Sequence, residues 1–249
     1  MRVDFHSHCL PGVDHGCRDL EGSLTVLKKA KNEGAETVVA THHFFPGKDD
    51  LDEFLEKRKS ALQRVKSASK EGEIPNIILG AEVYLTTETV GFERISELCI
   101  EGTNYILIEM PYDYWMPWVM DAIYQITDEH GLIPIIAHIE RYKPVRNNPD
   151  LIGQLTDIGA VIQANTSSVF YPETYRFLKS LFKKRLVHVL GSDTHSPNEE
   201  NNFSKAFERI ERRFGKAYRE IIDMNSERIL NGDDIERKEF TRGYTIFKF

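Results

Sequence analysis

The opening stretch Arg2-Val3-Asp4-Phe5-His6-Ser7-His8 predicts the first strand of the fold, because a short apolar run leads there into two histidines. Side chains alternate between the two faces of an extended segment, so both imidazoles are expected on one side of it. Near the other end of the chain, Val187–Gly191 is a similar run, and Ser192-Asp193-Thr194-His195 follows it. This second stretch is expected to repeat the same geometry with a carboxylate and an imidazole.

Runs of this kind recur along the whole chain and alternate with segments of helical periodicity, which is typical of βα units around a parallel sheet. For example, Leu24, Leu27 and Ala30 have helical spacing, and Gly34 ends that segment. The runs are Arg2–Phe5, Thr37–Thr41, Ile77–Gly80, Tyr105–Ile108, Ile133–Ala137, Ala160–Ala164 and Val187–Gly191. They predict seven strands of an α/β fold.

A single domain is expected over residues 1–249, because no linker, low-complexity stretch or charge block interrupts the alternation before the end of the chain. A chain of 249 residues and 28.7 kDa is long enough to bury a hydrophobic core of its own. Residues 231–249 are expected to form a C-terminal tail or an edge segment, since Asn231–Glu239 is polar and Tyr244–Phe249 alternates.

Composition argues against several classes of function. The formal net charge is −7 and the basic residues are dispersed, so nucleic-acid binding is not expected. No apolar run approaches the roughly 18 residues of a membrane span, and no signal peptide is recognisable, which predicts a cytoplasmic protein without membrane insertion. None of Cys9, Cys17 and Cys99 is followed by an arginine six positions later, so the spacing of a thiolate phosphatase is missing.

The strongest functional signal is the position of polar side chains at the ends of the predicted strands. In a parallel βα barrel these ends open on one face, so residues spread over nearly 190 positions are expected to converge. A single histidine or glutamate at such a place is more often a packing or solvated residue, but the complete set favours one site. The set comprises His6, His8, His42, His43, Glu82, Glu109, His138, Asn165, Asp193 and His195.

Mixed imidazole and carboxylate side chains suit Zn²⁺, Mn²⁺ or Fe²⁺ better than Mg²⁺ or Ca²⁺. One catalytic ion takes about three protein ligands, so a set of this size implies more than one ion, with Glu82 or Glu109 as a bridge. Multinuclear sites serve hydrolysis at phosphorus, where one ion generates hydroxide and the others hold the oxygens. Arg141 lies three residues past His138, and its guanidinium is suited to phosphate oxygens. A surface salt bridge with Glu140 is its alternative role.

Six motifs, in chain order, resemble the PHP (polymerase and histidinol phosphatase) superfamily. They are Asp4-Phe5-His6-Ser7-His8, Thr41-His42-His43, Gly80-Ala81-Glu82-Val83-Tyr84, Ile108-Glu109, Ala137-His138-Ile139-Glu140-Arg141-Tyr142 and Ser192-Asp193-Thr194-His195. The third and fifth are similar to the bacterial protein-tyrosine phosphatases of capsule and exopolysaccharide operons. The resemblance runs from the first strand to about Leu230, nearly the whole chain.

The resemblance implies a distorted (β/α)7 barrel with two or three divalent ions, commonly Mn²⁺, with Fe or Zn as alternatives. It implies hydrolysis of phosphotyrosine on the tail of a tyrosine autokinase that controls polysaccharide export, or of another aryl phosphate. The implied catalytic residues are Arg141, which would bind phosphate, Asp193 and His195. The implied ligands are His6, His8, Glu82 and Asp193 for one ion, Glu82, Glu109 and His138 for a second, and His43 and His195 for a third.

The chain departs from the family pattern at two places. The turn Val13-Asp14-His15-Gly16 has a histidine where relatives usually have a second acid that is a ligand to the third ion. Because imidazole binds the same metals, His15 is expected to take that place. Relatives also often carry an arginine shortly after the Ser-Asp-x-His motif, and residues 196–203 contain none. A second phosphate contact from this segment is therefore not expected.

Other functions fit part of the same pattern. A small-molecule phosphoesterase of the superfamily, such as a histidinol-phosphate phosphatase, would use the same kinds of residue. An amidohydrolase-like metal hydrolase also begins with His-x-His, but it would need a lysine at the end of the fourth strand, where Glu109 stands. A metal-binding regulator would hold its ions in closed coordination. The sequence leaves the oligomeric state open.

Overall fold

Seven parallel strands follow one another in chain order around one sheet in the computed structural model, which describes residues 1–235. They are β1 (Val3–Ser7), β2 (Thr37–Phe44), β3 (Asn76–Tyr84), β4 (Tyr105–Glu109), β5 (Ile133–Ile136), β6 (Val161–Asn165) and β7 (Val189–Gly191). Thr194, just past β7, bridges in parallel to Ser7 of β1. The strands therefore form a nearly closed barrel, as the sequence predicts.

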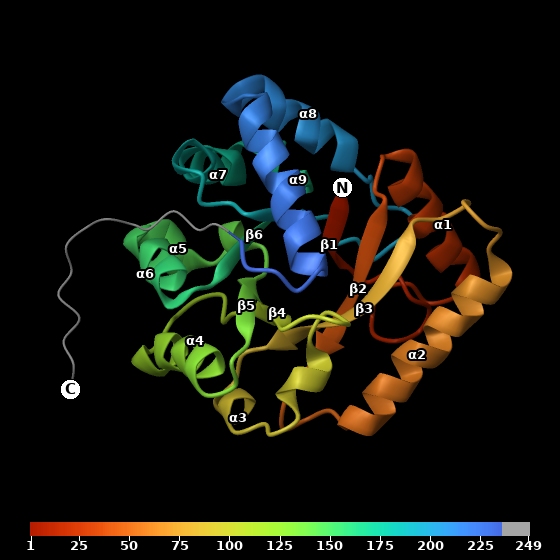
Figure 1. The fold of residues 1–249 in the computed structure, drawn as a ribbon, viewed down its shortest axis with the longest axis horizontal. Helices are drawn as coiled ribbons and strands as arrows, with labels where there is room; N and C mark the ends of the chain where they lie inside the picture. The colour runs from red at the N-terminus through yellow and green to blue at the C-terminus, as the bar shows by residue number, and fades with distance from the viewer. Residues whose placement is uncertain (236–249) are drawn as a thin grey trace.

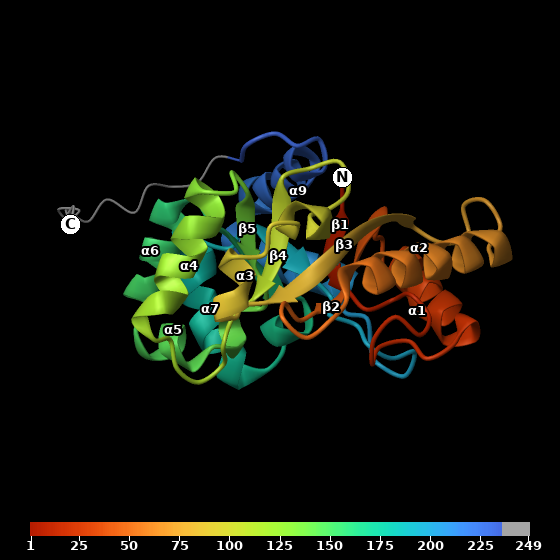
Figure 2. The same cartoon turned by 90° about the horizontal axis from the view of Figure 1, so that it is seen from below.

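Helices cover the outside of the barrel (Figures 1 and 2). The pair α1 and α2 packs on one side, α4 to α7 lie on the other, and α9 packs against β1 and β7 with α8 beside it. Their bounds are α1 (Leu20–Asn32), α2 (Leu51–Ala68), α3 (Thr87–Val90), α4 (Pro117–Asp128), α5 (Lys143–Asn147), α6 (Asp150–Ile158), α7 (Pro172–Lys184), α8 (Phe203–Phe214) and α9 (Lys216–Leu230). Short 3₁₀ turns cover Ile95–Leu98, Ile139–Arg141 and Ser167–Val169.

The helices begin and end where local chemistry predicts. The side chain of Asp19 accepts a hydrogen bond from the backbone N–H of Gly22, and Asp50 accepts one from Glu53, so α1 and α2 both begin at an aspartate cap. Gly34 follows α1 with a φ of 85°, a conformation that glycine adopts without steric cost. No helix between residues 1 and 235 is both long and apolar enough to cross a membrane.

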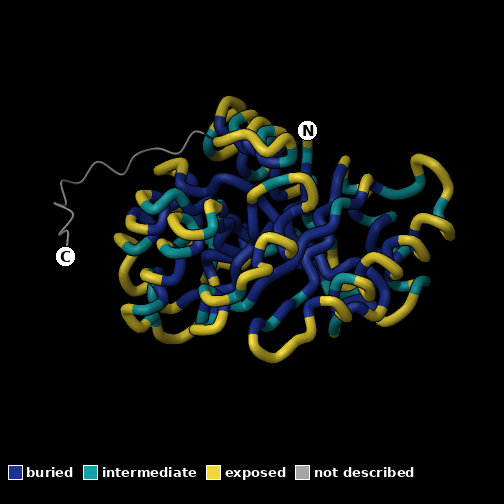
Figure 3. Tube along the Cα trace, turned by 60° about the horizontal axis from the view of Figure 1, so that its bottom comes forward, coloured by how far each residue is buried: buried dark blue, intermediate teal, exposed yellow. Residues whose placement is uncertain are grey.

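Two clusters of buried apolar side chains hold these layers together. The smaller cluster takes residues such as Phe5, Val39, Leu107 and Val161 from strands all around the ring, so it fills the barrel interior. The larger cluster packs the strands against the helices. The buried part of the chain runs through the strands, and the exposed part lies in loops and on outer helix faces (Figure 3).

The strands differ from the predicted runs mainly at their carboxyl ends. β2 continues to Phe44 and β3 to Tyr84, so polar residues expected to follow these strands lie within them. The physical reason is that a parallel ladder bonds backbone groups whatever the side chain is. The tail or edge segment expected over residues 231–249 lies, from residue 236 onward, outside the described residues.

Candidate metal centre

Eight of the nine side chains predicted to bind metal come together at the carboxyl ends of the strands. They are His6, His8, His43, Glu82, Glu109, His138, Asp193 and His195. Each belongs to a group of three whose donor atoms all lie within 4.8 Å of one another. Residues from both ends of the chain therefore meet at one mouth of the barrel, as the strand order requires.

The carboxylate of Glu82 is the centre of this cluster. Its Oε2 lies 3.1 Å from Nε2 of His6, 3.3 Å from Nε2 of His8 and 3.0 Å from Nδ1 of His43. Its Oε1 lies 2.9 Å from Nε2 of His138. Glu82 is 1% exposed, so this carboxylate is removed from water and faces four imidazoles.

The spacing of these atoms fits metal ligands better than a hydrogen-bond network. The Nε2 atoms of His6 and His8 are 3.1 Å apart, and Oε2 of Glu82 makes no hydrogen bond to the described residues despite its three close nitrogens. Donor atoms bonded at about 2.0–2.2 Å to one ion lie at roughly such separations from each other. Oδ1 of Asp193 completes the group at 3.4 Å from His6 and 3.6 Å from His8.

Glu109 extends the cluster on the side of β4. Its Oε1 lies 3.7 Å from Nε2 of His138, and its Oε2 lies 3.7 Å from Nδ1 of His43. The hydroxyl of Tyr112 donates a short hydrogen bond to Glu109, and the Tyr112 ring stacks on His138 with 5.9 Å between centroids. Glu82 and Glu109 therefore share two histidine neighbours, an arrangement that suits bridging carboxylates.

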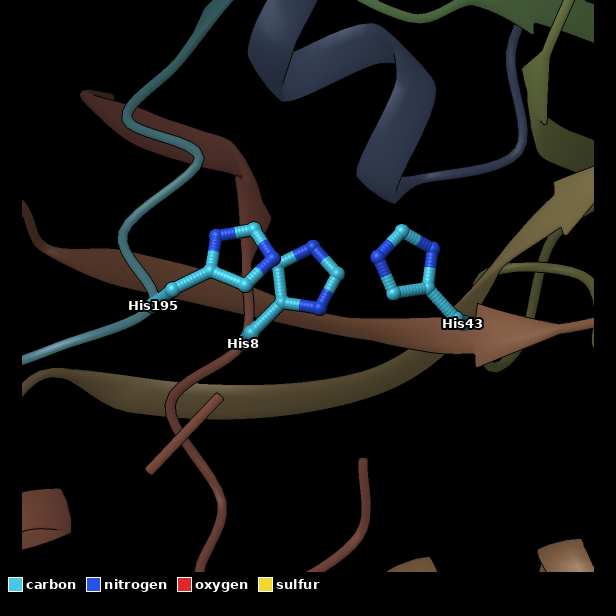
Figure 4. A group of neighbouring side chains, drawn as sticks. All are labelled: His8, His43 and His195. Carbon is cyan, nitrogen blue, oxygen red and sulfur yellow. The ribbon is translucent and has the colours of Figure 1, made fainter. Parts of the chain in front are cut away.

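Three histidines from three segments form the open edge of the cluster (Figure 4). The rings of His8 and His195 are stacked 3.8 Å apart, and His43 faces them from β2, 4.5 Å from His8. His15 lies just outside, with its ring stacked 4.8 Å from both His43 and His195. His15 is exposed and belongs to none of the close donor groups, so its position fits a ligand less tightly than the other eight.

Asp14 organises this edge, although it is not among the nine predicted metal ligands. Its Oδ2 accepts hydrogen bonds from Nδ1 of His8 at 2.6 Å and from the backbone N–H of His43 at 3.1 Å. When the imidazole of His8 is neutral, as in a metal ligand, donation from Nδ1 leaves the lone pair on Nε2, which faces Glu82. A carboxylate behind a histidine is a common way to orient metal ligands.

His42 belongs to this supporting layer and not to the cluster around Glu82. Its Nε2 accepts a hydrogen bond from the backbone N–H of Leu10 at 3.1 Å, and its Nδ1 lies 3.0 Å from Oδ1 of Asp14. Burial lowers the pKa of His42. Burial would raise the pKa of Asp14, but hydrogen bonds from His42 and His8 hold it well below its usual range. Asp14 is therefore an ionised acceptor.

Two of the predicted metal-binding residues adopt a left-handed backbone. His138 has a φ of 28° and Asp193 a φ of 55°. The expectation that Asp193-Thr194-His195 is extended like the first strand is therefore wrong at Asp193, where the chain turns just before Thr194 bridges to Ser7. Such conformations cost about 1–3 kcal/mol each in non-glycine residues and persist only where surrounding contacts enforce them.

Arg141 reaches the cluster from the 3₁₀ turn after β5. Its Nη2 lies 2.6 Å from Oδ2 of Asp193 and its side chain is 42% exposed, beside a cavity of about 590 Å³ that Tyr171 and His195 also line. The alternative of a salt bridge with Glu140 is wrong, because Glu140 is fully buried and accepts a hydrogen bond from the backbone N–H of Asn165.

Comparisons with known proteins agree with this geometry. The family model described as capsular polysaccharide synthesis, CpsB/CapC, matches residues 2–231. The tyrosine-protein phosphatase YwqE of Bacillus subtilis (strain 168) is 30% identical over 241 residues, covering 95% of this chain and 94% of the relative. The tyrosine-protein phosphatase CpsB of Streptococcus pneumoniae is 29% identical, covering 92% of this chain and 98% of the relative.

Comparison with solved structures supports the same fold. A crystal structure from work on YwqE and CpsB, described there as unique metal-dependent tyrosine phosphatases, superposes with a TM-score of 0.84 at 27% identity, covering 95% of this chain and 97% of the other. Histidinol phosphate phosphatase from Lactococcus lactis superposes with a TM-score of 0.55 at 16% identity, covering 86% of this chain and 94% of the other, and shares the fold.

Proposed function

This chain belongs to the CpsB/CapC family of capsular polysaccharide synthesis, and we propose that it is a metal-dependent protein-tyrosine phosphatase that hydrolyses phosphotyrosine. The observation that carries the proposal is the buried carboxylate of Glu82 among four imidazoles, with the Arg141 guanidinium at the open edge. Metal ligands and a phosphate-binding cation are thereby within reach of one bound phosphate.

The donor set fits two or three divalent ions, and we propose Mn²⁺ as the metal, with Fe or Zn as alternatives. His6, His8, Glu82 and Asp193 would hold one ion, Glu82, Glu109 and His138 a second, and His43, His195 and His15 a third. When bound, such ions polarise phosphoryl oxygens and lower the pKa of water. Asp14 orients His8 for this role, and Arg141 would hold the non-bridging oxygens of the phosphate.

The proposed substrate is the phosphorylated tail of a bacterial tyrosine kinase, which the names of the relatives and the capsule-synthesis family favour. The runner-up is a small aryl or alkyl phosphate, such as histidinol phosphate. Hydrolysis of a phosphotyrosine peptide, a phosphoserine peptide and histidinol phosphate, each with added Mn²⁺, would separate the two. We expect the phosphotyrosine peptide to give the highest kcat/KM, and preferential hydrolysis of histidinol phosphate would contradict the proposal.

We expect Arg141→Ala to raise KM for aryl phosphates about ten- to a hundredfold, because charge-assisted hydrogen bonds are worth about 1.5–3 kcal/mol. The metal content should not change, since Asp193 also accepts a hydrogen bond from Nδ2 of Asn165 at 2.9 Å. Steady-state kinetics and elemental analysis measure the two quantities. Arg146→Ala, at an exposed position of α5, is the control. Loss of metals from Arg141→Ala would instead assign Arg141 a structural role.

His15→Asp should strengthen binding of the third ion. A carboxylate would bring the negative charge that the imidazole lacks, so the metal concentration for half-maximal activity should fall several-fold. The measurement is a titration of both stripped proteins with Mn²⁺. His130→Asp serves as the control, because His130 follows α4 and bonds to Val90 away from the cluster. Superimposable curves for His15→Asp and the unmodified protein would show that residue 15 binds no metal.

A further inference from the structure

β6 supplies none of the donors in the cluster. Two of its side chains, however, contact predicted ligands that come from three other strand ends. Gln163 and Asn165 are both fully buried. Oε1 of Gln163 lies 2.5 Å from the backbone nitrogen of His138 and 3.4 Å from Nδ1 of His6. Nδ2 of Asn165 lies 2.9 Å from Oδ2 of Asp193. The two amides are joined by a 2.8 Å bond from Nε2 of Gln163 to Oδ1 of Asn165.

Gln163 and Asn165 form a short chain of hydrogen bonds. The groups at the two ends of this chain determine which atom donates and which accepts in every bond. A backbone N–H can only donate, so the Gln163 atom that faces His138 must be its oxygen. At the other end, the ionised Asp193 can only accept, so Asn165 must present its NH₂ group there. Nε2 of Gln163 then donates to Oδ1 of Asn165, and neither amide can flip without breaking bonds at both ends.

This direction determines which nitrogen of His6 carries a proton. Oε1 of Gln163 is an acceptor, so Nδ1 of His6 must hold the hydrogen that faces it. In the neutral imidazole that a metal ligand requires, Nε2 of His6 is then left with the lone pair, and this atom lies 3.1 Å from Oε2 of Glu82. Gln163 therefore orients His6 through its Nδ1, as Asp14 orients His8, but it adds no negative charge to the cluster.

The same two amides contact both predicted metal-binding residues whose backbone is left-handed. Gln163 binds the N–H of His138, and Asn165 binds the carboxylate of Asp193. The close approach depends on Gly191, because a Cβ there would lie 2.5 Å from Cβ of His6 and 2.9 Å from Nε2 of Gln163. Gly191 therefore leaves the space in which Gln163 and His6 can lie next to each other.

We propose that Gln163 and Asn165 are positioning residues that fix the tautomer of His6 and the orientations of His138 and Asp193, so that β6 acts as the support of the metal centre. This proposal rests on the metal centre proposed above. It predicts a single tautomer of His6 and a lower metal affinity when Gln163 is replaced. Both can be measured without assaying the reaction.

The first test uses the unmodified protein with ¹⁵N-labelled histidine and saturating Zn²⁺, which is diamagnetic. Long-range ¹⁵N–¹H spectra, assigned with His6→Gln, should show His6 protonated at Nδ1 and bound to metal through Nε2. A His6 bound through Nδ1, or present as a mixture of tautomers, would overturn the proposal. A protein that binds no Zn²⁺ would remove the metal centre itself, and with it the proposed function.

The second test compares Gln163→Met with Gln163→Glu by competition of each protein with a chromophoric chelator for Zn²⁺. Met fills the volume of Gln163 but offers no acceptor to His6. We therefore expect mixed His6 tautomers and about a 10- to 100-fold loss of Zn²⁺ affinity, as for other residues that hydrogen-bond to metal ligands. Glu keeps the oxygen that faces His6 and should restore its single tautomer. Asn225→Leu is the matched control, because it removes a buried amide that bonds to His188. Equal affinities and His6 spectra for Gln163→Met and the unmodified protein would refute the proposal.

Discussion

Stripping the protein of divalent ions should lower hydrolysis of aryl phosphates about a thousandfold or more, because metal Lewis acids contribute several kcal/mol to such reactions. Without ions, Arg141 is the cation beside Asp193, and its pairing with that carboxylate reduces the charge it can offer to phosphate. Activity is measured before and after dialysis against a chelator, with elemental analysis of the purified protein. Two or three ions per chain are expected.

The control for this experiment is the integrity of the fold. The carboxylate of Glu82 lies 3.0 Å from His43 and 3.1 Å from His6, and these imidazoles can pair with it once they are protonated. The stripped protein should therefore keep its circular dichroism spectrum and regain activity with Mn²⁺. At most one ion per chain, together with activity that is indifferent to chelator, would contradict the multinuclear model.

Glu82→Gln should have the second largest effect, with activity reduced about a thousandfold and at least one ion lost. The substitution keeps the shape of the side chain but replaces one carboxylate oxygen by an NH₂ group, which cannot bind metal. Both oxygens of Glu82 face imidazole nitrogens, so either orientation of the amide removes an oxygen donor from the proposed ion sites. Metal content and kcat are measured together, with Glu93→Gln at an exposed position as the control.

A variant that retains its full complement of ions would show that Glu82 is not a ligand. Loss of activity with full metal content would instead leave the carboxylate a role in orienting the histidines. Replacing the buried carboxylate by an amide also removes ion pairs with the imidazoles and can destabilise the fold. The free energy of unfolding is therefore measured for the variant, to separate loss of stability from either result.

The fold and most of the cluster could be predicted because both follow from short-range rules. Apolar runs alternate with helical segments, and polar residues at run ends converge when the strands are parallel, so the seven-stranded barrel is confirmed. The resemblance of two motifs to the tyrosine phosphatases of capsule operons is confirmed by the CpsB/CapC family model and by relatives that are named tyrosine-protein phosphatases. The convergence of His6 and Asp193 needs only the strand order and its closure.

The supporting residues could not be predicted because their roles depend on atoms that the sequence does not place. Gln163 sits inside an apolar run and would be taken for an ordinary core amide; its function becomes visible only through its distance to His6. Asp14 lies in a turn, where aspartate is common for backbone reasons alone. The left-handed turn at Asp193 has only a weak sequence signal, because aspartate adopts this conformation more often than most non-glycine residues, yet few aspartates do.

The closure of the barrel also sets the order in which the protein can mature. His6 and His8 leave the ribosome nearly 190 positions ahead of Asp193 and His195. At synthesis rates of about 5–20 residues per second, the two halves of the cluster are separated by roughly ten seconds or more. Contacts of such long sequence separation form late in folding. The proposed ion site formed by His6, His8, Glu82 and Asp193 is therefore complete only when β7 has docked beside β1.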